Sequence, residues 1–150
     1  IGAMLLAFIA LIAMLNGMLE AAGALVGLEQ LTLERVLGGL LQPLAWALGV
    51  PWNEAQLAGS LIGQKFILNE FVAYVSYSEI ADQLSPHAQA IVIFALCGFA
   101  NFASIGIQIG GIGSLAPGQR KVLSEFGMKA LIGGTIASLM SATIAGMIIG

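Results

Sequence analysis

The stretch "GQKFILNEFVAY", residues 63 to 74, places a lysine and a glutamate in sequence that otherwise resembles a membrane interior. Lys65 and Glu70 lie five residues apart. A carboxylate in the middle of a bilayer costs roughly 2.5 to 3.5 kcal/mol, so it normally faces a water-filled cavity or a partner. We therefore expect Glu70 to point inward and to bind a hydroxyl group or a cation. A structural pair with Lys65 across a chain reversal is the alternative interpretation.

A short helix is predicted on each side of this stretch. Asn53 is a suitable N-cap for a helix that begins just after Pro51. A second helix begins at Asn69 or Glu70. Because each helix is too short to cross a bilayer alone, we predict a re-entrant helical hairpin over residues 52–80, with non-helical backbone at its tip.

The composition places the chain in a membrane. Of its 150 residues, 59% are hydrophobic and 9% are charged, with a mean hydropathy of +0.97, whereas a soluble fold needs more polar surface. Three uncharged runs reach the ~18 to 20 residues that a spanning helix needs, and we expect crossings there, at residues 1–19, 83–119 and 130–150. Glycines four residues apart, such as the pairs Gly59/Gly63 and Gly106/Gly110, are typical of helices that pack closely in lipid. The predicted fold class is an all-α membrane protein.

The segment "GFANFASIG", residues 98–106, interrupts the helix that we predict over residues 86–115, with Ser85 as its N-cap. Asn101 and Ser104 share one face if the segment is helical, and glycines lie at both of its ends. Such a segment can unwind while it stays buried in protein. We therefore expect a discontinuous transmembrane helix.

Two interpretations are open for the polar residues of this segment. A single Asn or Ser in a transmembrane helix commonly binds a neighbouring helix. Asn101 and Ser104 share one interrupted segment, however, and the predicted hairpin supplies Glu70, an arrangement by which secondary transporters bind solutes. Phe99 is either core filler or a ring that packs on an aromatic base or a sugar. We predict a solute site formed by these residues: Glu70, Asn101, Ser104 and Phe99.

Other segments complete the predicted architecture. Residues 1–27 form a long transmembrane helix. Residues 28–50 carry several charges, among them Glu29, and are interrupted by Pro43, so we expect an amphipathic, interfacial helix there. Residues 51–150 contain the hairpin, the broken helix and a last transmembrane helix at 122–149.

Several function classes are excluded on composition. A net charge of −3 with only five Lys and Arg provides no basic stripe, so we expect no nucleic acid polymer as a partner. Cys97 is the single cysteine, which excludes an internal disulfide and a Cys-rich metal site. Because no nucleophile and base pair and no metal-ligand spacing is present, we expect no catalytic residue, no bound metal, no covalent cofactor and no enzyme. The chain begins with Ile1 inside a predicted crossing, so we expect it to be part of a longer polypeptide.

Two blocks carry a resemblance to a known family: "NEFVAY" at 69–74 and "ALCGFANFASIGIQIGGIGSLAPG" at 95–118. Together with "PWNEA" at 51–55, they resemble the C-terminal part of the concentrative nucleoside transporters, which include bacterial nucleoside permeases. The resemblance implies a homotrimer in the bacterial inner membrane that imports nucleosides of the uridine, cytidine or adenosine class with Na+ or H+. It also implies that residues 1–27 are a scaffold helix at the trimer contact and that residues 51–150 are half of a mobile transport domain.

The resemblance also implies roles for single residues. The ribose hydroxyls would be held by Glu70, Asn101 and Ser104, and the base would be contacted by Phe99. The frequent paired serines of the family are Ala103 and Ser104 here, which puts a role for position 103 in doubt. The first hairpin of the family, with the residues attributed to the nucleobase and the sodium site, does not occur in this sequence. The chain is therefore expected to supply the ribose-binding half of the site, with the coupling ion bound in the N-terminal part.

Three hypotheses follow for the intact protein. The first is a cation-coupled nucleoside symporter. The second is a channel or a structural membrane subunit, in which Glu70 lines a pore or fixes the hairpin. An intramembrane enzyme is the third. The choice between Na+ and H+ coupling and between purine and pyrimidine solutes stays open at this stage.

Overall fold

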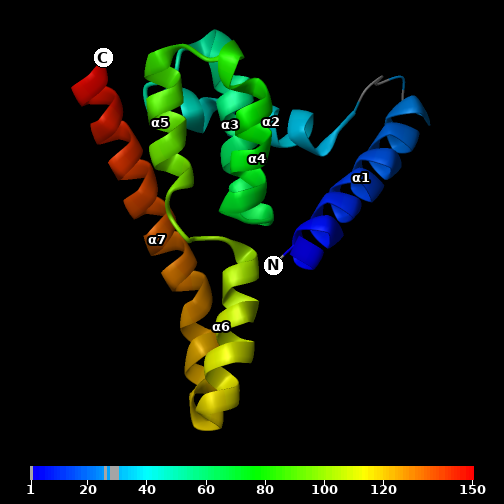
Figure 1. Cartoon of the computed structure of the whole chain (residues 1–150), viewed down its shortest axis with the longest axis vertical. Helices are drawn as coiled ribbons and strands as arrows, with labels where there is room; N and C mark the ends of the chain where they lie inside the picture. The colour runs from blue at the N-terminus through cyan, green and yellow to red at the C-terminus, as the bar shows by residue number, and fades with distance from the viewer. Residues whose placement is uncertain (1, 26, 28–30) are drawn as a thin grey trace.

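The chain is all-helical. The computed structural model describes residues 2–25, 27 and 31–150, together with their side chains except those of residues 2–9 and 12. No strand occurs in this described part (Figure 1), so the all-α prediction is confirmed. In chain order the elements are α1 (Gly2–Leu25), α2 (Leu33–Ala47), α3 (Trp52–Ile67), α4 (Glu70–Ile80), η1 (Ala81–Gln83), α5 (Pro86–Leu96), α6 (Phe102–Leu115), η2 (Pro117–Gln119) and α7 (Arg120–Ile149).

One long helix runs along the side of a helical bundle. Figure 1 shows α2, α3, α4 and α5 gathered in the upper part, with α7 beside α5 above and beside α6 below. Helix α6 points away from the bundle, and a short turn joins it to α7 at the lower tip. Helix α1 stands to one side, where Asn16 donates to the Glu34 carboxylate at 3.0 Å and accepts from the backbone amide of Leu33 at 2.7 Å.

The core lies where α2, α3 and α5 pack together. Its largest apolar side chains, which are fully buried, include Leu61, Ile62 and Ile91. Helix α3 approaches α2 so closely that a Cβ on Gly59 would lie 2.9 Å from a backbone carbon of α2. The close packing predicted from the glycine spacing is therefore confirmed at Gly59, whereas a Cβ on Gly106 would meet nothing within 4 Å.

Two local predictions near the start of the hairpin were wrong. Helix α3 begins at Trp52 with the extended residue Pro51 (φ −54°, ψ 140°) before it, so Asn53 lies in the first turn and does not cap the helix. The reason is the tight reversal at Gly49 (φ +109°), which follows α2 directly and presents Pro51 at the helix start. Helix α2 also continues through Pro43 rather than breaking there. Packing along α3 overrides the local cost of the proline.

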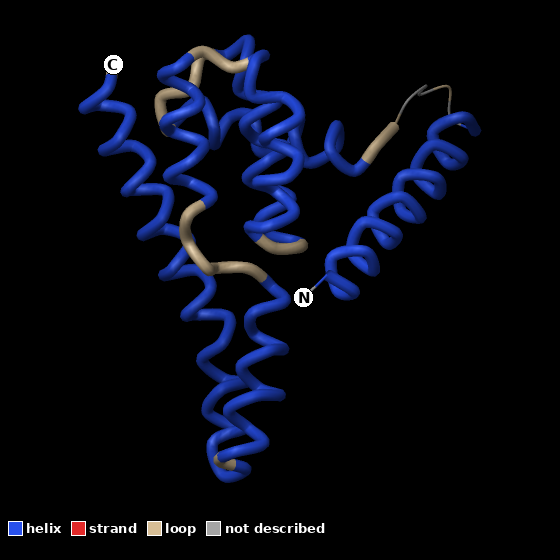
Figure 2. Tube along the Cα trace, in the orientation of Figure 1, coloured by secondary structure: helices blue, strands red, loops and turns tan. Residues whose placement is uncertain are grey.

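The two helix interruptions that we expected are present. Leu68 and Asn69 separate α3 from α4, and residues 97–101 separate α5 from α6, shown as loops in Figure 2. The expected last helix at 122–149 corresponds to α7. The position of these elements within a membrane stays a prediction.

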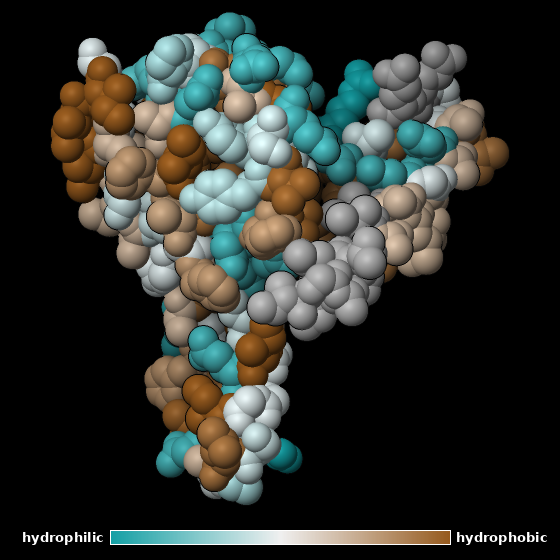
Figure 3. Space-filling model, viewed as in Figure 1, coloured by the Kyte–Doolittle hydropathy of each residue, from teal (hydrophilic) through white to brown (hydrophobic). Residues whose placement is uncertain are grey.

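The lengths of the apolar helices agree with only part of the expected membrane crossings. In the described part of the chain, the helical stretch Pro117–Ile149, with 33 residues and a hydropathy of 1.7, is the one long and apolar enough to cross a bilayer. Figure 3 shows apolar side chains exposed along the upper part of α7 and around the lower tip. The run at 83–119 is divided into the shorter helices α5 and α6. Residues 2–19 of the first run lie in α1, where many side chains fall outside the described part. Glu29 also lies outside the described residues.

Candidate functional site

Helices α4 and α6 both begin with an asparagine cap. Asn69 precedes α4 in an extended conformation, and its side chain accepts from the backbone amide of Val72 at 2.9 Å. Asn101 precedes α6 in the same way and accepts from the backbone amide of Ser104 at 2.8 Å. Asparagine is a preferred N-cap because its oxygen satisfies an amide that the helix leaves free. These caps fix where each helix begins and place Glu70 in the first turn of α4.

The two helix starts meet through a hydrogen-bonded cluster. The Asn101 Nδ2 group donates to Glu70 Oε2 at 2.9 Å, and the Ser104 hydroxyl donates to Asn101 Oδ1 at 2.8 Å. Asn101 is 2% exposed, Ser104 is 9% exposed, and Glu70 is partly exposed. The structure therefore brings together the three polar residues that the sequence singled out.

The alternative pairing of Glu70 with Lys65 is not found. No ion pair joins these two described residues, and Lys65 Nζ instead donates to the Ala95 carbonyl at 3.1 Å and to Ser138 Oγ at 2.9 Å. The Glu70 carboxylate receives its hydrogen bond from Asn101. Glu70 is thus held by the start of α6 and not by the lysine of its own hairpin.

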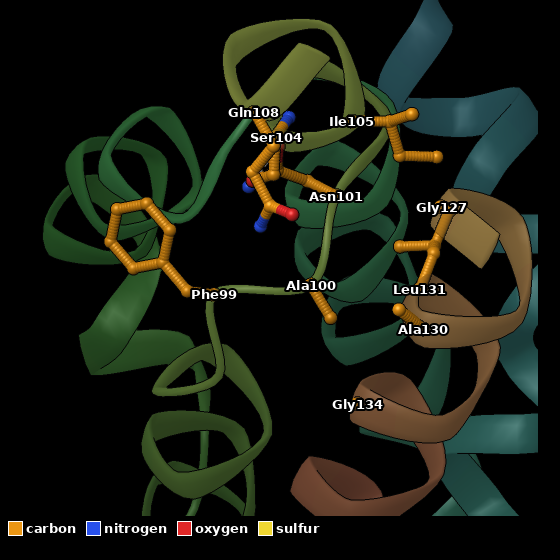
Figure 4. Close-up of a pocket in the computed structure, with 10 residues that line it drawn as sticks. All are labelled: Phe99, Ala100, Asn101, Ser104, Ile105, Gln108, Gly127, Ala130, Leu131 and Gly134. Atoms are coloured by element: carbon orange, nitrogen blue, oxygen red, sulfur yellow. Dashed lines mark hydrogen bonds between the residues drawn. The ribbon is translucent and has the colours of Figure 1, made fainter. Parts of the chain in front are cut away.

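A pocket of about 210 Å³ opens beside this cluster (Figure 4). The start of α6 forms one wall, and small and apolar residues of α7 form the other. The lining residues are Phe99, Ala100, Asn101, Ser104, Ile105, Gln108, Gly127, Ala130, Leu131 and Gly134. Glu70 is not among them, and its hydrogen bond to Asn101 connects it to the pocket wall.

Phe99 differs from the other predicted site residues. It lies between α5 and α6 and is 76% exposed. In Figure 4 its ring points away from Gly127 and Leu131 on the α7 wall. The core-filler interpretation is therefore wrong for this ring, because it packs in no core of the described chain.

Sequence reasoning missed two parts of the pocket. Gln108 lies four residues after Ser104 on the same helix, so the helical repeat brings both side chains to one face, as Figure 4 shows. The spacing of four residues could therefore have identified Gln108 from the sequence. The α7 wall, which includes Gly127 and Leu131, comes from a distant part of the chain and has no local signal.

The arrangement is suited to binding neutral polyhydroxylated solutes. A carboxylate oxygen, an amide and a hydroxyl are offered close together, and these groups can accept from and donate to neighbouring hydroxyls. The described part of the chain gathers no group of three or more His, Cys, Asp or Glu side chains that could hold a metal ion.

Comparisons with known proteins place the chain in a family. The family model described as "Na+ dependent nucleoside transporter C-terminus" matches residues 1–146. The chain is similar to the uncharacterized transporter YutK of Bacillus subtilis, with 53% identity over 149 residues, 99% of this chain and 37% of that protein. It is 47% identical to the nucleoside permease NupC of Helicobacter pylori over 155 residues, covering 100% of this chain and 37% of that protein. With the sodium/nucleoside cotransporter 1 of Rattus norvegicus it shares 37% over 163 residues, 99% of this chain and 25% of that protein.

Solved structures give the same result. The chain matches CNTnw in an inward-facing substrate-bound state with a TM-score of 0.92 and 51% identity, over 97% of this chain and 36% of that one. It matches a variant of CNTnw in an outward-facing state with a TM-score of 0.94 and 50% identity, over 99% of this chain and 36% of that one. The chain thus spans between 25% and 37% of the length of the proteins compared.

Proposed function

We infer, from the premise that this chain belongs to the family of Na+-dependent nucleoside transporters, that the intact protein is a cation-coupled nucleoside symporter. In this proposal the chain supplies the ribose-binding half of the solute site, in a protein that spans the bacterial inner membrane. The observation that carries the proposal is the Glu70, Asn101 and Ser104 cluster at the interruption between α5 and α6. Relatives named as nucleoside permease and sodium/nucleoside cotransporter support the solute class.

The cluster suits a ribose because a vicinal diol presents two adjacent hydroxyls. Glu70 Oε2 already accepts from Asn101, and the described residues donate to no other atom of this carboxylate, so Oε1 is free to accept from a solute hydroxyl. The second proton of the Asn101 amide and a lone pair of Ser104 can serve the neighbouring hydroxyl. A solute without these hydroxyls would leave polar groups unpaired in a site shielded from water, which penalises its binding.

Phe99 completes the proposed half-site. It is one of the residues that line the pocket, and its exposed ring is available to pack on an aromatic base. The remaining contacts to the base, and the site of the coupling ion, would come from the part of the protein outside this chain. The Na+ dependence of the family favours sodium as that ion, with H+ as the alternative. A homotrimer with α1 at the subunit contact is part of the same proposal.

The proposal is tested by binding of nucleosides to the full-length purified transporter. Glu70→Gln removes the charge that strengthens a hydrogen bond, so uridine affinity should fall about 10- to 100-fold. Ser104→Ala removes one neutral hydrogen bond and should cost about fivefold. Both losses should shrink for a uridine analogue that lacks the 2′- and 3′-hydroxyls, because the analogue never makes these contacts.

Matched controls lie on the same two helices. Glu79→Gln changes an exposed carboxylate of α4, and Ser114→Ala removes an exposed hydroxyl of α6 that bonds only within its own turn. Neither should change uridine affinity. Equal affinity of the wild type, Glu70→Gln and Ser104→Ala would remove the site assignment, because a ribose contact cannot be lost without a change in binding.

A further inference from the structure

Lys65 is a buried ammonium group near the end of α3. It is 0% exposed, and lysine is almost never fully buried without a partner. Its Nζ lies 5.4 Å from the centre of the Phe66 ring, and no described carboxylate forms an ion pair with it. A neutral side chain of similar size would fill this volume without the desolvation penalty of a charge. Packing alone therefore does not explain why a lysine is buried at this place.

The contacts of Lys65 lie at the end of α5. Nζ donates to the Ala95 carbonyl at 3.1 Å and to Ser138 Oγ at 2.9 Å, and the Ser138 hydroxyl lies 3.3 Å from the same carbonyl. Helix α5 ends at Leu96, so Ala95 is in its last turn, where carbonyls lack amide partners. A cation is favoured there by the negative end of the helix dipole. Lys65 thus caps α5 from a different helix.

The backbone after α5 rests directly on this arrangement. We call residues 97–101 the link and the group of Lys65, the Ala95 carbonyl and Ser138 the pin. A Cβ on Gly98 would lie 2.6 Å from Ser138 Cβ and 3.5 Å from Lys65 Nζ. The link therefore packs closely on the pin at Gly98. This residue lies one position before Phe99 and three positions before Asn101.

We propose that Lys65 is a positioning residue of the solute site, which acts through the link to hold Asn101 against Glu70. This inference rests on the proposed function, because it assumes that Asn101 contacts the solute. Lys65 joins the first arm of the hairpin to α5 and α7, while Asn101 joins the link to the second arm. The hairpin is thus tied to the interrupted helix on both sides of the link, and removal of one tie leaves Asn101 free to shift.

The test is a double-mutant cycle on the full-length transporter. The single variants are Lys65→Met, which fills the same space without charge, and Asn101→Ser, which keeps a capping side chain but loses the amide that binds Glu70. Uridine affinity is measured on folded, monodisperse protein. Lys65→Met should weaken uridine binding about tenfold in the wild-type background but less than about twofold in the Asn101→Ser background.

Each other outcome has a distinct meaning. Equal weakening in both backgrounds, or none in either, would overturn the positioning role, since a purely structural lysine does not act through Asn101. An Asn101→Ser variant with wild-type affinity would instead refute the proposed function. Lys121→Met, which removes an exposed lysine of α7, is the matched control and should leave affinity unchanged.

A second variant covers a failure of Lys65→Met to fold. Ser138→Ala keeps the ammonium and its bond to Ala95 and removes the other acceptor of Lys65. It should weaken uridine binding about threefold, again with a smaller effect when Asn101 is already serine. An equal effect in both backgrounds would count against the proposal in the same way.

Discussion

Asn101 has two roles at the scale of the single residue. Its oxygen caps α6, and its amide nitrogen holds the Glu70 carboxylate. The residue that starts the helix is therefore the same one that connects the helix to the hairpin. A substitution of Asn101 therefore alters both the start of α6 and the candidate site. Substitutions that retain a capping side chain are the informative ones, because they change the site and keep the start of the helix.

Gly98 is the residue at which the link approaches the pin closely. Because a Cβ would approach Ser138 Cβ to 2.6 Å, Gly98→Ala should displace the link at a cost of about 1–3 kcal/mol and weaken uridine binding at least about fivefold. Equilibrium binding to the detergent-solubilised transporter measures the effect. Gly106→Ala is the control, since a Cβ there meets nothing within 4 Å. Similar affinities of the two variants would show that the contact beneath Gly98 has no bearing on the site.

Single residues were predictable where their chemistry was out of place in an apolar sequence. Glu70, Asn101 and Ser104 stood out on that ground, and the structure brings them together. The partners of Lys65 were not predictable, because Ala95 and Ser138 lie 30 and 73 residues further along the chain. Gln108 was overlooked although its spacing from Ser104 pointed to the same helix face.

At the scale of the element, α5 is fixed at both ends by α3. At its start, the N-cap residue Ser85 is bound by Glu54 of α3, whose Oε2 accepts from the amide and the hydroxyl of Ser85 at 2.9 Å each. In its last turn, the Ala95 carbonyl accepts from Lys65 Nζ of α3. A short helix of 11 residues gains little stability on its own, so these contacts from outside set its position.

Glu54→Ala should therefore loosen α5 at its start. Loss of the two hydrogen bonds to Ser85 should lower the free energy of unfolding by about 1–3 kcal/mol, seen as a lower midpoint in a thermal unfolding scan of the purified transporter. Uridine affinity should change less than in the pin variants, because the start of α5 is distant from the link along the helix. Glu125→Ala, on the exposed surface of α7, is expected to unfold like the wild type. An unchanged midpoint for Glu54→Ala would contradict the anchoring role.

Element boundaries were predictable where a cap or an interruption is local. Ser85 acts as the N-cap that the sequence suggested, and α4 begins at Glu70, one of its two expected starts, with Asn69 as its N-cap. Asn53 was assigned wrongly because Pro51 already supplies the extended residue before α3. The uninterrupted course of α2 through Pro43 depends on its packing against α3, which no local pattern reveals.

At the scale of the whole molecule, the Glu70, Asn101 and Ser104 cluster lies where the start of α4 meets the start of α6. In the described residues, the order of the α-helices agrees with the prediction from apolar runs, caps and interruptions, whereas the short helices η1 and η2 were not predicted. The side-by-side arrangement of α7 with both α5 and α6 did not follow from these patterns, because it depends on contacts between distant segments. The family resemblance supplied what local physics lacked, namely the solute class, and the family model agrees with it.

The intact protein is predicted to concentrate its solute. In proteoliposomes with an inward Na+ gradient, radiolabelled uridine should rise above its external concentration and fall back when an ionophore removes the gradient. Accumulation driven by a pH gradient alone would assign H+ as the coupled ion. A channel, which is the alternative function, would let uridine reach only equal concentrations under every gradient, and that result would exclude a symporter.

The course of α7 has a mechanical consequence. Helix α7, one continuous helix of 30 residues, lies against both α5 and α6 and so fixes these two helices relative to each other across the link. The link therefore cannot act as a hinge unless α7 itself bends. Under the proposed function, we therefore expect α5, α6 and α7 to move together as one body during transport, with the bending at joints outside these helices.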